Sequence, residues 1–133
     1  MQVYECKYRR VAVERDMDLI RDILLKVAAD PELDGSRFKL FDTSDFEGYS
    51  QEEIAYHIDL LFEADFVKGV ASLDAPAPAI TRLTWEGHEF VDNIRDATVW
   101  NSVKERIKGL QSVAISVVAQ LALAEAKKHL HLE

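Results

Sequence analysis

Apolar positions recur along this chain with helical spacing, most clearly between residues 50 and 67. One stripe, at positions i, i+4, i+7 and i+8, is formed by Ile54, Ile58, Leu61 and Phe62. This spacing favours a helix over a half-buried strand. Ser50 and Glu53 have the spacing of a capping box, in which each side chain bonds the other residue's backbone N–H. The pattern predicts a helix from Ser50 to Val67 with an acidic outer face.

A first helix is predicted before this one. Asp16 is a good N-cap for it, and Pro31 marks its end because proline cannot continue the helical hydrogen bonds. Its apolar stripe consists of Ile20, Ile23, Leu24 and Val27. The apolar spacing again fits one buried helix face.

Three short strands are predicted around the capped helix. Residues 37–41 alternate polar and apolar side chains, as a half-buried strand does. Residues 66–73 and 79–83 are predicted as the two strands of a hairpin, because Pro76 and Pro78 between them favour a turn or loop.

Two further helices are predicted after the hairpin, over residues 85–96 and 99–108. Thr84 is expected to cap the first and Gly109 to end the second. Trp85 and Trp100 share the spacing of the apolar positions in these helices, so both are expected in the core.

The last predicted helix, Ser112–His129, is the most apolar segment of the chain. Its polar side is a narrow seam made of Ser112, Ser116 and Gln120. A helix that is apolar almost all round is buried, either in its own domain or against a partner. We therefore expect this helix to be a candidate homodimer contact. Its apolar run, residues 113–124, is too short to span a membrane.

Length and composition bound the class of protein. The 133 residues suffice for one domain with its own hydrophobic core. Cys6 is the single cysteine, so an intramolecular disulfide is impossible, and a free thiol suits a reducing cytosol. The first residues lack the pattern of a secretion signal. We expect a cytoplasmic protein without membrane contact.

The net charge of −8 is concentrated in one stretch of the chain. Residues 42–65 contain no Lys or Arg and carry eight acids: Asp42, Asp45, Glu47, Glu52, Glu53, Asp59, Glu63 and Asp65. The remaining residues sum to zero charge. The molecule is therefore expected to have an acidic middle and mildly basic ends.

Two phrases of the sequence match motifs of winged-helix regulators. Residues 54–67, IAYHIDLLFEADFV, resemble the end of their recognition helix, and residues 83–90, LTWEGHEF, resemble the segment after the wing in PadR-type and MarR-type proteins. Together with residues 15–21 and Trp100, they make residues 15–110 similar to a small bacterial and phage family of unknown function. The resemblance implies an α+β fold that is mostly α: a winged helix-turn-helix with a small antiparallel β-wing and additional C-terminal helices.

The resemblance also implies how the chain is divided. Residues 1–15 would form an N-terminal arm or short strand, residues 16–96 the winged-helix domain, and residues 97–131 C-terminal helices for packing or dimerisation. Residues 132–133 look like the scar of a purification tag and are left out of the fold.

By the same resemblance, the protein is expected to be a DNA-binding transcriptional regulator. Its charge departs from that pattern, because DNA affinity comes largely from Lys and Arg on phosphates and the recognition-helix region has neither. If the chain binds DNA, the contacts are expected at Lys7, Arg9, Arg10, Lys39, Lys68 and Arg82. In a second departure, Asp65 replaces the usual glycine, which predicts a different end to the helix.

A protein–protein interaction module is the alternative. Tyr56 is predicted on the polar side of its helix, about 200° from Ile54, and an exposed aromatic ring among carboxylates suits a protein interface. The expected interaction surface consists of Glu52, Tyr56, Asp59 and Glu63. On charge alone, the acidic stretch also permits an anti-repressor or DNA mimic.

The sequence contains no motif for catalysis or for a cofactor. His57 and His88 lie within the matched phrases, but no Cys, His or Asp recurs at ligand spacing, so a structural role is expected for both. Cys6 is expected to be an isolated reduced thiol. The chain is therefore predicted to be a non-catalytic protein without a cofactor or a metal.

Overall fold

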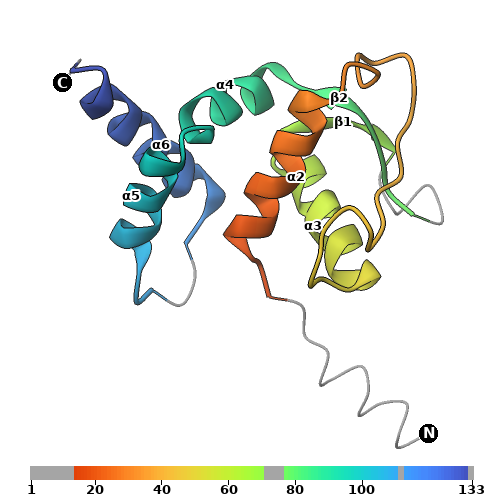
Figure 1. Cartoon of the computed structure of the whole chain (residues 1–133), viewed down its shortest axis with the longest axis horizontal. Helices are drawn as coiled ribbons and strands as arrows, with labels where there is room; N and C mark the ends of the chain where they lie inside the picture. Colours follow the sequence, from red (N-terminus) through yellow and green to blue (C-terminus); the bar gives the residue numbers. More distant parts are fainter. Residues whose placement is uncertain (1–13, 71–76, 111–112, 132–133) are drawn as a thin grey trace, which may run out of the picture.

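The structure is a computed structural model that describes residues 14–70, 77–110 and 113–131. Within these residues the chain forms five helices and one two-stranded antiparallel sheet, an α+β fold that is mostly helical (Figure 1). The elements are α2 (Met17–Ala29), α3 (Gln51–Glu63), β1 (Val67–Val70), β2 (Ala79–Leu83), α4 (Trp85–Ile94), α5 (Ala97–Ile107) and α6 (Ile115–His129). Figure 1 shows α2, α3 and the hairpin on one side of the molecule and α5 and α6 on the other, with α4 between them.

Helix α2 confirms the sequence prediction. The Asp16 side chain accepts hydrogen bonds from the backbone N–H groups of Asp18 and Leu19, at 2.9 and 3.2 Å. The four apolar residues expected on its inner face are buried, and Leu19 joins them. None of the helices within the described residues is long and apolar enough to cross a membrane.

Helix α3 starts as predicted. The Ser50 hydroxyl accepts from the Glu53 N–H at 3.1 Å, and the Glu53 carboxylate accepts from the Ser50 N–H at 2.9 Å. Both halves of the capping box are therefore present. The inner face of the helix is formed by Ile54, His57, Ile58 and Leu61, all buried, while Phe62 is half-buried.

The end of α3 differs from the prediction. The helix stops at Glu63 instead of Val67, because Asp65 has a left-handed φ of 62° and turns the chain. The Asp65 N–H donates to the Phe62 carbonyl at 3.0 Å and the Phe66 N–H to the Leu61 carbonyl at 2.9 Å. These two bonds form a Schellman motif. The prediction of a different helix end was therefore wrong: aspartate tolerates the conformation that glycine usually supplies.

Strands β1 and β2 form the expected hairpin. Val67 pairs with Leu83 and Lys68 with Arg82, and the register then shifts at a bulge. Residues 71–73, which were also predicted as strand, and part of the Pro-containing tip lie outside the described residues. Thr84 caps α4 through the Gly87 N–H at 2.9 Å, as predicted, and its hydroxyl donates to the Asp65 carbonyl at 2.6 Å.

The predicted strand over residues 37–41, here called the edge segment, is reduced to one pair. Lys39 and Ile80 exchange two backbone hydrogen bonds, at 2.9 and 3.0 Å. Lys39 therefore lies on the same sheet face as the buried Ile80, and its neighbours face the other way. Phe38 and Leu40 are 64% and 62% exposed, so the half-buried alternation expected here was wrong. Only Phe41, at the end of the segment, enters the core.

Trp85 is also a correction, because its side chain is 75% exposed instead of buried. Helix α4 buries Gly87, Phe90, Val91 and Ile94. Trp85 lies about 200° around the helix from Gly87 and so points away from that face. Trp100, on α5, is 2% exposed and confirms the prediction.

Helix α6 buries only one stripe, formed by Val118, Ala122 and Glu125. That stripe packs against α4 and α5. The opposite side carries Val117 and Leu123, which are 43% and 46% exposed. The Ser112–His129 helix thus lies partly in its own domain, and a homodimer contact on its exposed side stays a prediction.

Candidate interaction surfaces

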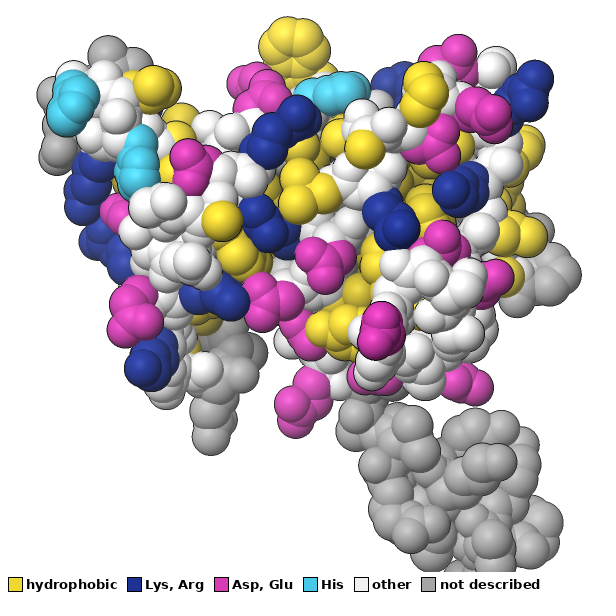
Figure 2. Space-filling view, in the orientation of Figure 1, with side chains coloured by type: hydrophobic (Ala, Val, Ile, Leu, Met, Phe, Trp, Pro, Cys, Tyr) yellow, Lys and Arg dark blue, Asp and Glu magenta, His cyan; other side chains and the backbone are white. Residues whose placement is uncertain are grey.

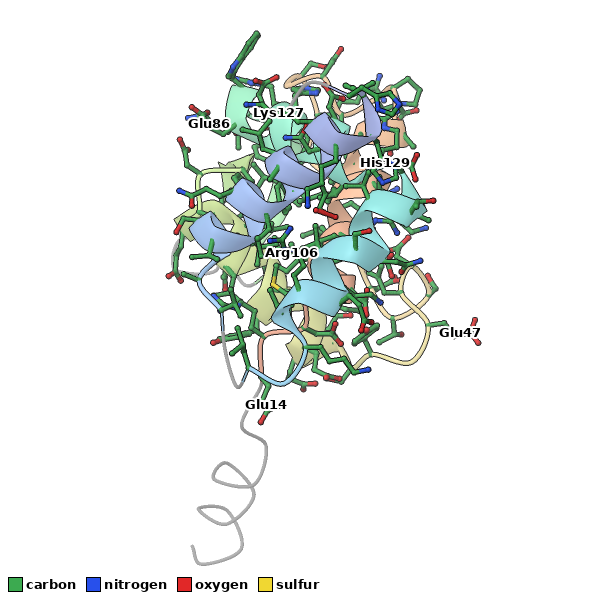
Figure 3. The ribbon with its side chains drawn as sticks, turned by 90° about the vertical axis from the view of Figure 1, so that its left-hand side faces the viewer. Glu14, Glu47, Glu86, Arg106, Lys127 and His129 are labelled. Carbon is green, nitrogen blue, oxygen red and sulfur yellow. The ribbon has the colours of Figure 1, made fainter. Side chains whose placement is uncertain are left out.

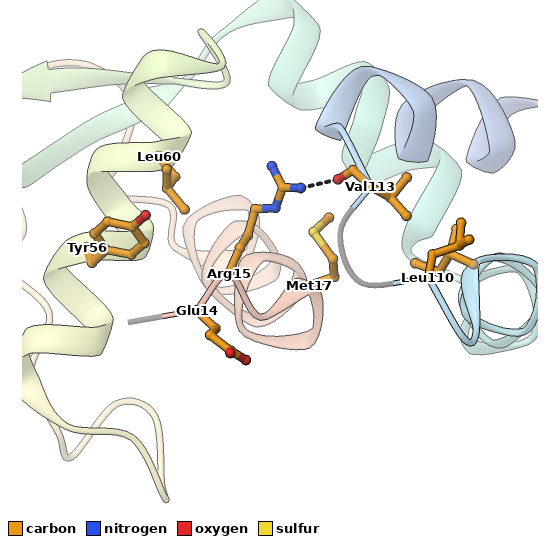
Figure 4. A pocket seen from close by; sticks show the side chains of 8 residues that line it. Glu14, Arg15, Met17, Tyr56, Leu60, Leu110 and Val113 are labelled. Atoms are coloured by element: carbon orange, nitrogen blue, oxygen red, sulfur yellow. Dashed lines mark hydrogen bonds between the residues drawn. The ribbon is translucent and has the colours of Figure 1, made fainter. Parts of the chain in front are cut away.

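A cleft of about 430 Å³ lies between α3 and the connection from α5 to α6 (Figure 4). Figure 4 shows α3 with Tyr56 and Leu60 on one side, Arg15 and Met17 in the middle, and Val113 with Leu110 on the other side. The lining consists of Glu14, Arg15, Met17, Tyr56, Leu60, Ile107, Leu110 and Val113. Three separate parts of the chain thus form a cleft that is lined by apolar side chains and by the charged Glu14 and Arg15.

A smaller hollow of about 180 Å³ continues this cleft along α3. It shares Arg15 and Leu60 with the first and adds Leu61, Glu63, Ala64 and Ile115, together with Ile20. The Arg15 guanidinium donates a hydrogen bond to the Val113 carbonyl, as the dashed line in Figure 4 marks. This bond joins the start of α2 to the segment before α6.

His57 positions α3 beside the start of α2. The ring is fully buried; its Nε2 accepts from the Asp16 N–H at 2.7 Å and its Nδ1 donates to the Glu53 carbonyl at 2.7 Å. A backbone N–H can only donate, so the ring is neutral with its proton on Nδ1. His57 therefore has a structural role. The described residues contain no group of three or more side chains that could hold a metal ion.

Tyr49 completes this junction. Its hydroxyl donates to the Asp16 carboxylate at 2.9 Å. Burial, together with this hydrogen bond and the negative charge of Asp16, raises the pKa of Tyr49 to about 12. Asp16 thus caps α2, accepts from Tyr49 and donates its N–H to His57. Sequence reasoning found only the cap.

The four residues expected to form a protein-binding surface lie on one face of α3. Their spacing of i, i+4, i+7 and i+11 follows the helical repeat; they are Glu52, Tyr56, Asp59 and Glu63. Tyr56 is 42% exposed and meets the His57 ring edge-on, with centroids 5.7 Å apart. This acidic stripe borders the cleft at Tyr56 and the smaller hollow at Glu63.

The candidate DNA contacts are only partly brought together. Lys68 and Arg82 are exposed neighbours across the hairpin. Lys39 lies on the core side of the edge segment, with its ammonium 3.3 Å from the Asp30 carboxylate and over the Phe41 ring. Lys7, Arg9 and Arg10 lie outside the described residues. On the face shown in Figure 2, Lys and Arg are interspersed with Asp and Glu.

Three polar contacts hold the C-terminal helices. The Trp100 indole donates to Asp18 at 2.8 Å, and Lys104 forms an ion pair with the same carboxylate at 3.1 Å, which joins α5 to α2. Arg106 lies between α5 and α6 in Figure 3 and pairs with Glu125 at 3.1 Å. These contacts hold the helices next to the far wall of the cleft, and no local sequence pattern predicts them.

These features define a small, mostly helical α+β protein with a cleft of mixed polarity beside an acidic helix. The chain belongs to the DUF2513 family, whose model, described as "Hypothetical protein (DUF2513)", matches residues 14–114. This finding confirms the resemblance to a family of unknown function. An uncharacterized protein of Haemophilus influenzae (strain ATCC 51907 / DSM 11121 / KW20 / Rd) is 38% identical over 119 residues, which cover 85% of this chain and 98% of that protein. No solved structure matches the chain.

Proposed function

We propose that this chain is a non-catalytic cytoplasmic binding module with a winged-helix arrangement, and that it binds a protein partner through α3 and the adjoining cleft. The arrangement is supported by the order of its parts: α2, the edge segment, α3 and the hairpin. The Lys39–Ile80 pair sets the edge segment beside β2, so β2 lies between it and β1. Two helices followed by such a wing also fit the resemblance to PadR-type and MarR-type proteins.

The single observation that carries the protein-binding proposal is the cleft beside Tyr56. Its apolar residues come from α2, α3, the end of α5 and the α5–α6 connection, and its volume lies in the range of ligand-binding clefts. Tyrosine at the edge of such a cleft supplies contact area at a small entropic cost. The acidic stripe beside it favours a protein surface over a phosphate backbone, because carboxylates repel phosphates.

The test compares the partners captured by the wild type with those captured by a Tyr56→Ala/Glu63→Lys double variant. We expect the variant to weaken partner binding on the order of tenfold or more, because it removes the aromatic contact and reverses one charge of the stripe. A Lys68→Ala/Arg82→Ala variant serves as the matched control and should retain the partners. If the Tyr56→Ala/Glu63→Lys variant captured the same proteins in equal amounts, this surface would not be the binding site.

DNA binding through the hairpin is the second candidate function. It is favoured by the cross-strand pair of Lys68 and Arg82, both exposed, since a wing can place such cations on phosphates. We expect weak, salt-sensitive binding to random-sequence duplex that the Lys68→Ala/Arg82→Ala variant loses. The absence of binding at about 50 µM protein in low salt would rule this function out.

A further inference from the structure

The edge segment has backbone groups that face away from the rest of the molecule. Lys39 uses both its N–H and its C=O on Ile80, at 2.9 and 3.0 Å. In an extended chain, the neighbouring residues direct their N–H and C=O groups to the opposite side. Among the residues that the structure describes, none bonds the backbone groups of Phe38 or Leu40. These two residues therefore form an open sheet edge.

The side chains at this edge are apolar where an edge usually carries charge. Phe38 and Leu40 are 64% and 62% exposed. Natural sheets commonly protect an edge with an outward lysine, a proline or a covering loop. Of the two cations of this segment, Lys39 lies on the core side beside Asp30, and Arg37 lies before the two apolar residues, near Glu32. An open edge with outward apolar side chains is a template for another extended strand.

We propose that this edge pairs with the same edge of a second copy of the chain. In an antiparallel arrangement centred on Lys39, Phe38 of each copy lies opposite Leu40 of the other. The two pairs exchange four backbone hydrogen bonds, since the backbone N–H and C=O groups of Phe38 and Leu40 face outward in each copy. Each pair also places an aromatic ring against a leucine across the strands, which stabilises a sheet. The sequence Phe-Lys-Leu is thus self-complementary at this edge.

The charges near the edge are compatible with self-association. Lys39 lies 3.3 Å from the Asp30 carboxylate, and Arg37 lies 3.9 Å from the Glu32 carboxylate. In this arrangement Lys39 of one copy lies opposite Lys39 of the other, and the Asp30 carboxylate beside each ammonium reduces the repulsion between them. The short edge predicts a weak dimer, in the class of transient interfaces that bury less than about 1,200 Å².

The experiment is sedimentation velocity of the full chain from micromolar to millimolar concentration, combined with amide hydrogen exchange. We expect a monomer–dimer equilibrium in which exchange at Phe38 and Leu40 slows as the concentration rises. The Lys39 N–H should be protected at every concentration, because its bond to Ile80 is intramolecular. A strict monomer at millimolar concentration, or exchange at Phe38 and Leu40 that does not depend on concentration, overturns the proposal.

Three variants locate the contact. Leu40→Pro removes an outward N–H without touching the Lys39–Ile80 pair and should raise the dimer dissociation constant on the order of tenfold or more. Leu40→Lys keeps the backbone donor, adds a repelling charge and replaces the proline variant if that one fails to fold. Leu123→Lys, on the exposed side of α6, should leave the dimer unchanged. A dimer that survives both Leu40 variants and is lost in Leu123→Lys would refute the edge contact.

Discussion

Helix α3 and the edge segment carry similarly clear apolar patterns, but only α3 buries them as the sequence predicts. Helix α3 is fixed by groups within itself: the capping box sets its start, and the i, i+4, i+7 stripe sets its inner face. The edge segment is fixed by Ile80, 41 residues away, and that pairing turns Lys39 inward and Phe38 and Leu40 outward. A local pattern predicts orientation when local bonds enforce it, and fails when a distant pairing sets the register.

The largest expected effect tests the two apolar patterns directly. Ile58→Ala on α3 should lower the free energy of unfolding by about 3.5 kcal/mol, because Ile58 is 1% exposed and its truncation leaves a cavity. Leu40→Ala on the edge segment should change it by less than about 0.5 kcal/mol, since that side chain is already in solvent. Denaturant unfolding of the two variants measures both. Equal losses of unfolding free energy in the two variants would mean that the apolar side chains of α3 and of the edge segment are equally buried.

Gly87→Ala tests how the end of α3 meets α4. A Cβ at Gly87 would overlap the Phe66 carbonyl oxygen, which lies in the turn after α3. We expect a loss of about 2–3 kcal/mol from this overpacking. The control is Gly48→Ala: Gly48 has a φ of 89° but no atom within 4 Å of an added Cβ, so it should lose about 1 kcal/mol from backbone strain alone. Thermal unfolding measures both losses of stability. Equal losses in Gly87→Ala and Gly48→Ala would contradict the close approach of Gly87 to the Phe66 carbonyl.

Ser50→Ala isolates the local signal at the start of α3. Removing the hydroxyl leaves the Glu53 N–H without its capping acceptor and should cost about 1 kcal/mol. Ser116→Ala, on an exposed position of α6, removes a hydroxyl without a capping role and should have almost no effect. The helix content and unfolding midpoint of the two variants provide the measurement. A neutral Ser50→Ala would show that tertiary packing alone fixes the start of the helix.

Trp100→Phe tests the long-range hydrogen bond from Trp100 to Asp18 through the pH dependence of stability. Burial raises the pKa of Asp18, but the hydrogen bonds from Trp100 and Lys104 outweigh it and hold the pKa below its ordinary value. The stability that results is present above the ordinary carboxyl pKa and is lost as the pH falls through the lower folded-state value.

The carboxylate is partly exposed, so the contribution of this contact should stay below about 1 kcal/mol. Melting temperatures at pH 6 and pH 3 should differ less in Trp100→Phe than in the wild type, because the pKa of Asp18 returns toward its ordinary value in the variant. Lys104→Met should shift the difference in the same direction. If the difference between the melting temperatures at pH 6 and pH 3 were unchanged in both variants, Trp100 and Lys104 would not be the cause of the lowered pKa of Asp18.

Much of the fold could be predicted from the sequence, because local chemistry specifies it. The Asp16, Ser50 and Thr84 caps lie where the sequence placed them, and β2 spans the predicted residues. The four residues of the acidic stripe on α3, Glu52, Tyr56, Asp59 and Glu63, share one helix face as expected from their spacing. Trp85 was predicted wrongly although the helical repeat of α4 puts it about 180° from the buried Ile94, on the outer face of the helix.

The cleft could not be predicted, because its walls come from parts of the chain that are far apart. Arg15 bonds Val113, 98 residues away, and Trp100 bonds Asp18, 82 residues away. No short pattern contains such pairs. His57 is an intermediate case: its buried position follows from the helical repeat, but its bond to the Asp16 N–H depends on how α2 and α3 cross.

The Thr84 hydroxyl links the turn after α3 to the start of α4 through two hydrogen bonds. It donates to the Asp65 carbonyl and accepts from the Gly87 N–H, while the Thr84 N–H donates to the Phe66 carbonyl at 3.0 Å. These bonds connect α3 to α4, and α4 packs against α6. We therefore expect a partner that displaces α3 to displace α6 as well, on the other side of the molecule.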